Sequence, residues 1–86
     1  MTYEVVWHER IADDLGSIPK RNAIRIIERV RTKLSADPAG AGKPLKGRFQ
    51  GLFSFRIGRF RVIYVVDHAE KRVRVLNVKD RKDVYR

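Results

Sequence analysis

The amino-acid sequence predicts an α+β fold, in which a helical hairpin packs on one face of a small, mainly antiparallel sheet. Helical periodicity is confined to the first 35 residues, and three strand-like segments follow after residue 51. Helices grouped before antiparallel strands are typical of this fold class. At 86 residues the chain has the length of one domain, and we expect the element order β-α-α-β-β-β over residues 1–86.

The first part of the chain supplies a strand and two helices. Residues 3–7 are rich in β-branched and aromatic side chains, which indicates a strand. We expect a short helix at residues 8–15 and a longer one at residues 19–35, because Pro19 is tolerated in a first helical turn. Apolar residues recur in the longer helix at the spacing of a buried stripe, which comprises Ala23, Ile27, Val30 and Leu34.

The second part predicts a loop and a three-stranded meander. Proline and glycine punctuate residues 37–44, which indicates a loop. Residues 52–57, 60–66 and 72–78 then form strands, and the second is expected at the centre because it is nearly continuous in apolar residues. The first of these strands alternates between two faces, one with Phe53, Phe55 and Ile57 and the other with Ser54 and Arg56.

The formal net charge of +10 indicates an anionic partner such as nucleic acid, an acidic protein or a membrane surface. No acid occurs between residues 38 and 66, so we expect one strongly electropositive face there, with Lys43, Lys46, Arg48, Arg56, Arg59 and Arg61. The longer helix adds a basic row of Arg21, Arg25, Arg29 and Lys33. This row is interpreted either as a solvated helix face or as a partner contact.

Composition argues against several kinds of site. The chain has no cysteine, and its two histidines are isolated, so we expect neither thiolate chemistry nor a metal or other cofactor. The first residues lack the regions of a signal peptide, and the longest apolar run, residues 62–66, is far too short to span a membrane. The expected location is therefore the cytoplasm.

Arg61 is the most informative charge within the strands. It lies in an otherwise apolar segment, where a charge is costly unless it reaches solvent or a partner. Charged residues of a sheet covered on one face must point to the other face or the edges, so we expect Arg56, Arg61 and Arg81 to converge. A fixed guanidinium suits a phosphate well, and the alternative is a snorkelling or ion-paired arginine.

The last eight residues, 79–86, place four basic residues and Tyr85 after the last strand. Together, Phe60-Arg61-Val-Ile-Tyr64 and Asp80-Arg81-Lys82-Asp83-Val84-Tyr85 resemble the RelE/ParE superfamily of toxins from type II toxin–antitoxin systems. Lys43-Pro-Leu-Lys-Gly47, Gly51-Leu-Phe-Ser-Phe-Arg56 and the element order fit the same pattern, so the resemblance covers essentially the whole chain. RelE is the closer match. Its relatives cut messenger RNA in the ribosomal A site with basic residues and a tyrosine rather than a metal.

The resemblance implies catalytic roles for Arg61, Arg81 and Tyr85. The two arginines would stabilise charge on the transition state when the 2′-hydroxyl attacks, and Tyr85 would act as acid or base or stack on a base. Tyr85 as a rim aromatic packed on the sheet edge is the plainer alternative. RNA contacts are expected from Arg56, Lys43, Lys46, Arg48, Arg59 and Lys82. Ser54 stands where some members have lysine, and Asp80 stands where many carry histidine.

The expected partners are a cognate antitoxin, in a toxin–antitoxin hetero-oligomer, and the ribosome with its mRNA. Two alternatives remain open from the sequence. In the first alternative, the chain is a ParE-like toxin that inhibits DNA gyrase by binding. In the second, it is a nucleic-acid-binding relative with weak or no catalysis.

Overall fold

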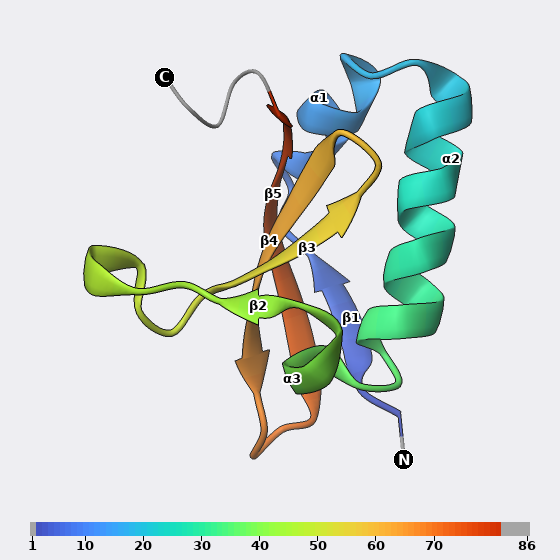
Figure 1. The fold of residues 1–86 in the computed structure, drawn as a ribbon. Coiled ribbons are helices and arrows are strands. Elements are labelled where there is room, and N and C mark those ends of the chain that lie inside the picture. The colour runs from blue at the N-terminus through green and yellow to red at the C-terminus, as the bar shows by residue number, and fades with distance from the viewer. Residues whose placement is uncertain (1, 82–86) are drawn as a thin grey trace.

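The computed structural model describes residues 2–81, which form a five-stranded sheet with α2 lying along one face (Figure 1). The strand order is β1-β5-β4-β3-β2, so β4 is central as predicted. β1 is parallel to β5 and the other pairs are antiparallel, which confirms the mainly antiparallel sheet. The strands are β1 (Glu4–Trp7), β2 (Lys43–Pro44), β3 (Phe53–Ile57), β4 (Phe60–Asp67) and β5 (Arg72–Asp80).

The first helix, α1 (Ile11–Gly16), begins three residues later than the predicted start at residue 8. The reason is that His8 still belongs to the sheet ladder, since its backbone N–H donates to the carbonyl of Val75 at 3.0 Å. The His8 ring then accepts from the backbone N–H of Arg10 at 3.2 Å, which turns the chain into the helix. Side-chain periodicity alone could not place this boundary, because it depends on pairing with β5.

The second helix, α2 (Lys20–Arg29), continues as one π-helical segment, η1 (Val30–Leu34). The hydroxyl of Thr32 donates to the carbonyl of Glu28 at 3.0 Å, a contact that accompanies the wider turn. This widening changes which residues face the core. Ile26 is fully buried, whereas the predicted Ala23 and Ile27 are only half-buried; Val30 and Leu34 are buried as predicted.

The prediction of a plain loop at residues 37–44 was wrong. A single helical turn, α3 (Pro38–Ala41), and the short strand β2 occupy this segment. The side chain of Asp37 accepts from the backbone N–H of Gly40 at 3.1 Å, and a proline in the first turn suits a helix start. β2 then pairs with β3 through Lys43 and Pro44, so the sheet has one strand more than the sequence predicted.

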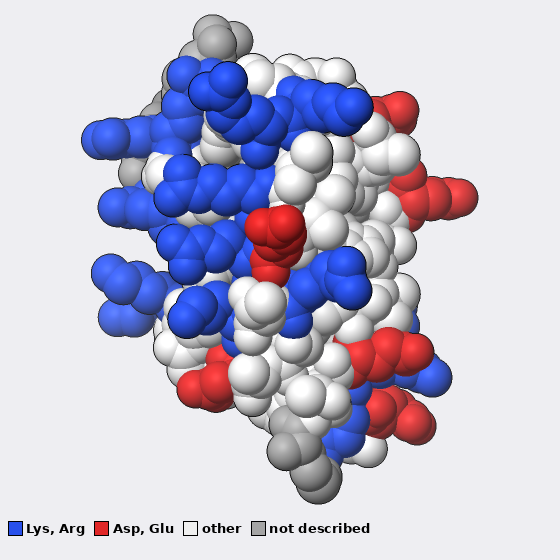
Figure 2. All heavy atoms as spheres, turned by 90° about the vertical axis from the view of Figure 1, so that its right-hand side faces the viewer, with Lys and Arg blue, Asp and Glu red and all other residues white. Residues whose placement is uncertain are grey.

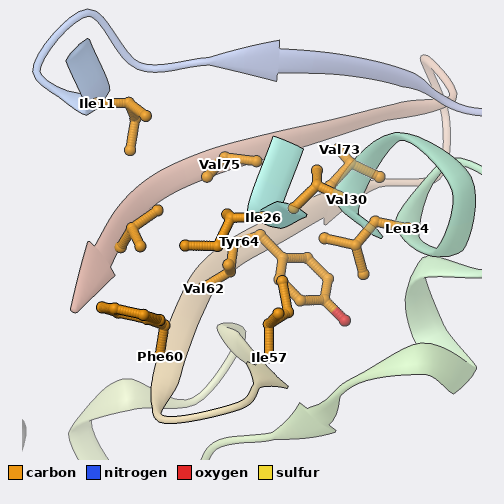
Figure 3. Packing of buried hydrophobic residues seen from close by; sticks show 11 residues of the cluster. Ile11, Ile26, Val30, Leu34, Ile57, Phe60, Val62, Tyr64, Val73 and Val75 are labelled. Carbon is orange, nitrogen blue, oxygen red and sulfur yellow. The ribbon is translucent and has the colours of Figure 1, made fainter. Parts of the chain in front are cut away.

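The core fills the space between α2–η1 and the sheet. Figure 3 shows Tyr64 and Val62 of β4 packed beneath Ile26, Val30 and Leu34 of the helix. Tyr64 and Val62 are fully buried, and Phe53 stacks on the Tyr64 ring at a centroid distance of 5.4 Å. No helix within residues 2–81 is long and apolar enough to cross a membrane.

Strand alternation gives the sheet a second face, turned away from α2, which we call the outer face. In β3 and β4 the buried residues alternate with outward ones. In β5 the register with β4 skips Leu76, so the strand carries a bulge there and alternates again beyond it. The outer face therefore carries Ser54, Arg56, Arg61, Ile63, Asn77 and Lys79.

Candidate functional site

Three basic residues lie directly opposite one another across the outer face. Arg56 of β3 is the register partner of Arg61 of β4, and Arg61 is in turn the partner of Lys79 of β5. Residues opposite each other in antiparallel strands have Cβ atoms about 4.5–5.5 Å apart, and like charges so placed destabilise the sheet. We call these three residues the cation row, and a bound anion would offset their repulsion.

A hollow beside the cation row extends the site toward β2. Its lining includes Lys43, Ser54, Arg56 and Arg61, together with Ala41 and Leu45. Lys43 is the register partner of Ser54, so its side chain leaves β2 on the outer face. The structure thus brings together three of the predicted site residues, and Lys43 adds a fourth cation to the row of Arg56, Arg61 and Lys79.

Arg59 and Arg81 lie where β4 begins and β5 ends. The backbone N–H of Arg81 donates to the Arg59 carbonyl at 2.7 Å, which continues the ladder beyond β5. The side chain of Arg59 forms an ion pair with Asp80, at 3.1 Å between Nε and Oδ2, beside a hollow that faces α1. Arg59 is therefore neutralised away from the cation row, and Arg81 is exposed just beyond the end of β5.

Lys46 and Arg48 lie on the connection between β2 and β3, which projects on the side of the outer face (Figure 1). Lys46 precedes the 3-10 turn η2 (Gly47–Phe49), and both cations are exposed. The guanidinium carbon of Arg48 lies 5.1 Å from the centroid of the Phe49 ring, and Phe49 as a residue is 48% exposed. Phe49 was not predicted as a site residue, because an aromatic in a loop carries no pattern in sequence.

The basic residues of α2 and η1 border the same edge of the sheet. Arg25, Arg29 and Lys33 line a groove whose other wall includes Arg56 and Gly58. Figure 2, which looks onto α2, shows Lys and Arg gathered toward one side and most Asp and Glu toward the other. The predicted segregation of charge along the chain is therefore a segregation in space.

Tyr64 fixes the segment that carries Lys43. Its hydroxyl donates to the carbonyl of Pro38 at 2.7 Å within the core. Burial raises the pKa of Tyr64 to about 12, against a lowering by the Gly42 backbone and a further raising by Asp37. The phenol is therefore neutral at any physiological pH, and it acts as an anchor between β4 and the residues before β2.

Lys79 is the site residue that the sequence alone did not single out by role. Basic residues and valines alternate along β5, which indicates that its basic residues share one face. Only the register with β4 shows that Lys79 lies opposite Arg61. The predicted residues Lys82 and Tyr85 lie outside the described residues. Within residues 2–81, no group of three or more His, Cys, Asp or Glu side chains is placed to hold a metal ion.

The arrangement suits an extended polyanion. Guanidinium and ammonium groups in one line can bind successive phosphates of a nucleic-acid strand. The planar guanidinium of arginine can bind two oxygens of one phosphate at once. The neighbouring loop adds two cations and an exposed ring, which are the groups that contact single-stranded nucleic acid. These features favour a nucleic-acid substrate over an apolar ligand.

Comparison with known proteins shows that the chain is similar to bacterial toxins over its whole length. The sequence pattern of the family described as ParE toxin of type II toxin–antitoxin system, parDE, matches residues 5–85. The chain is 35% identical to toxin RelG of Mycobacterium tuberculosis over 86 residues, which covers 100% of this chain and 99% of the relative. It is 34% identical to toxin RelE of the same organism over 84 residues, or 98% of this chain and 87% of the relative.

Solved structures show the same fold. A chain in the toxin–antitoxin complex RelBE2 of M. tuberculosis superposes with a TM-score of 0.89 at 32% identity, over 94% of this chain and 93% of that one. The archaeal RelE–RelB complex of Pyrococcus horikoshii gives a TM-score of 0.77 at 33% identity, over 94% and 97% of the two chains.

Proposed function

The chain belongs to the ParE toxin family of type II toxin–antitoxin systems, and we propose that it is a ribosome-dependent endoribonuclease that cleaves messenger RNA and so inhibits translation. The observation that carries this proposal is the cation row, in which Arg61 lies between Arg56 and Lys79. Whole-length similarity to toxins named RelG and RelE supports it.

The proposed reaction uses the RNA as its own nucleophile. The 2′-oxygen forms a bond to the neighbouring phosphorus and the bond to the 5′-oxygen breaks, so the products are a 2′,3′-cyclic phosphate and a 5′-hydroxyl. Charge accumulates on the phosphoryl oxygens at the transition state. Arg61, at the centre of the cation row, is placed to stabilise that charge, with Arg81 beside the end of β5.

Proton transfer requires a base for the 2′-hydroxyl and an acid for the 5′-oxygen. Of the three tyrosines in the chain, Tyr64 is buried and its pKa is raised to about 12. Tyr3 precedes β1, at the far edge of the sheet from β3, and is hydrogen-bonded to His68 at 3.0 Å. We therefore propose Tyr85 for the acid–base or stacking role, as the resemblance implies.

Dependence on the ribosome follows from this set of groups. The described site residues include no imidazole in the cation row, and general acid–base help is worth only about 10²–10⁴-fold. Orientation of the substrate must then supply much of the rate, and an mRNA held by the ribosome is already oriented. The proposed place of action is the cytoplasm, where translation takes place.

The proposal includes a protein antitoxin as partner. Structures similar to this chain include toxins in complex with RelB antitoxins. A net charge of +10 would favour acidic or amphipathic antitoxin segments, and binding should weaken with salt where exposed charges carry it. Copurification with the product of an adjacent reading frame tests this partner.

Cleavage of a defined mRNA on purified ribosomes tests the activity. Wild type is compared with Arg61→Gln, Arg81→Ala and Tyr85→Phe, and Arg72→Gln serves as a control of equal charge change. Arg72 is at the other end of β5 and is ion-paired with Glu4. We expect the single-turnover rate to fall by about 10²–10³-fold in Arg61→Gln and to stay near wild type in Arg72→Gln.

A gyrase supercoiling assay with the same protein distinguishes mRNA cleavage from the alternative, inhibition of DNA gyrase. Intact mRNA together with blocked supercoiling would replace the proposal by gyrase inhibition. Cleavage that is equally fast in wild type and Arg61→Gln would leave the activity in place but remove Arg61 from the catalytic role.

A further inference from the structure

Phe49 is exposed on a connection whose backbone is well defined by hydrogen bonds. The stem closes by a bond from the Leu45 N–H to the Leu52 carbonyl at 2.9 Å. At the tip, the N–H groups of Phe49 and Gln50 donate to the carbonyls of Lys46 and Gly47 at 3.3 and 3.0 Å. The Phe49 ring is thus presented by a formed turn.

Two glycines make this turn possible. Gly47 has a φ of +68° and Gly51 a φ of +98°, and residues other than glycine rarely adopt such values. They bracket the exposed ring on both sides in sequence. Their φ values let the chain turn tightly on both sides of the exposed ring.

The surroundings of Phe49 are those of a nucleic-acid contact. The Arg48 guanidinium lies over one side of the ring at 5.1 Å, and Lys46 is exposed at the start of the same turn. The stem of the loop joins Lys43 to Ser54, both of which line the hollow beside Arg61. The turn therefore lies on the β2 side of the cation row, in the direction that an RNA strand leaving Arg56 toward Lys43 would take.

We propose that Phe49 is a stacking platform for an unpaired base of the RNA that flanks the cleaved phosphate. Lys46 and Arg48 contact the adjoining phosphates. The inference rests on the proposed function, since it assigns a further substrate contact to the same site. Bases of single-stranded RNA stack on aromatic rings regardless of sequence, so the contact supplies affinity and register rather than base identity.

The test is binding of a short single-stranded RNA that carries a fluorescent 2-aminopurine, with Phe49→Trp, Phe49→Leu and Phe49→Ala compared with wild type. Ile24→Ala is the matched control, because Ile24 is 49% exposed and Phe49 is 48% exposed. We expect fluorescence quenching and affinity to be kept in Phe49→Trp. Phe49→Leu and Phe49→Ala should bind roughly 10- to 100-fold more weakly, with unchanged melting temperatures.

Equal RNA affinity in wild type, Phe49→Leu and Ile24→Ala would overturn the inference. So would weaker binding of the antitoxin by Phe49→Leu with RNA binding unchanged, since the ring would then be an antitoxin contact. Failure of the proposed function is seen separately, as wild-type protein that leaves ribosomal mRNA intact. A wild type that cleaves, together with a Phe49→Leu variant that binds and cleaves equally well, removes only the stacking assignment.

Discussion

The contact between Tyr64 and Gly42 can be tested by a double-mutant cycle. Tyr64 is fully buried, and its hydroxyl donates to the Pro38 carbonyl at 2.7 Å. A Cβ atom on Gly42 would lie 2.3 Å from the Tyr64 hydroxyl oxygen and 2.9 Å from the Ser54 carbonyl oxygen. Since φ of Gly42 is −108°, alanine is allowed by the backbone, and its cost comes from these contacts and a third, at 3.1 Å from Tyr64 Cε1.

Each single substitution has a magnitude that follows from its contact. Tyr64→Phe leaves the buried Pro38 carbonyl without its donor, which is expected to cost about 1–3 kcal/mol of the free energy of unfolding. Gly42→Ala overpacks the same place, which is expected to cost about 1–3 kcal/mol. In the double variant the contact with the hydroxyl no longer exists, whereas the contacts with the Ser54 carbonyl at 2.9 Å and with Cε1 of the ring at 3.1 Å remain.

The double variant should therefore be less destabilised than the sum of the two singles, by about 1 kcal/mol. Urea unfolding followed by circular dichroism gives the three differences, provided that the slope with denaturant is the same in all four proteins. Additivity within about 0.3 kcal/mol would refute the reasoning. Under the proposed function, Tyr64→Phe should also slow mRNA cleavage, because Tyr64 anchors the segment that leads to Lys43.

Three further outcomes follow from single contacts. The pKa of Tyr64 is raised from 10 to about 12, so its contribution to stability is present below pH 10 and lost between pH 10 and 12. The difference in unfolding free energy between wild type and Tyr64→Phe should therefore shrink over that range, by at most about 1.4 kcal/mol per pH unit. Asp14→Ala removes the acceptor of the Val78 backbone N–H at 3.0 Å and should cost about 1–3 kcal/mol in urea unfolding, whereas Asp13→Ala, at an exposed neighbour, should cost little. Asn77→Leu should raise the melting temperature, because the buried Oδ1 of Asn77 has no hydrogen-bond partner among the described residues.

Local patterns predicted most of the sheet. The alternation of Phe53, Phe55 and Ile57 and the apolar run of β4 gave the meander and its central strand, because a half-buried strand must alternate and a central one is covered more completely. β2 escaped prediction because two residues carry no period, and only pairing with β3 defines them as a strand. The π-helical segment shifted the buried stripe to Ile26 for a similar reason, since the wider turn is not encoded as periodicity.

The candidate site was predicted in its composition more than in its geometry. Of the three arginines predicted to converge, Arg56 and Arg61 are register partners on neighbouring strands, whereas Arg81 lies just beyond the end of β5. Arg59 was grouped with them by sequence proximity, but the turn before β4 directs its side chain to Asp80. Charge along the sequence therefore shows which segments are electropositive, whereas strand register shows which cations meet.

Register also bears on Ser54, which stands at a position where some RelE-like toxins have a lysine. In this sheet the residue directly across from Ser54 is Lys43, on the added strand β2, and both line the same hollow with Arg61. A lysine at position 54 would place a second ammonium opposite Lys43, which is unfavourable for like charges in a cross-strand pair. With serine at position 54, this cross-strand pair therefore carries a single cation, Lys43, in the hollow that Arg61 also lines.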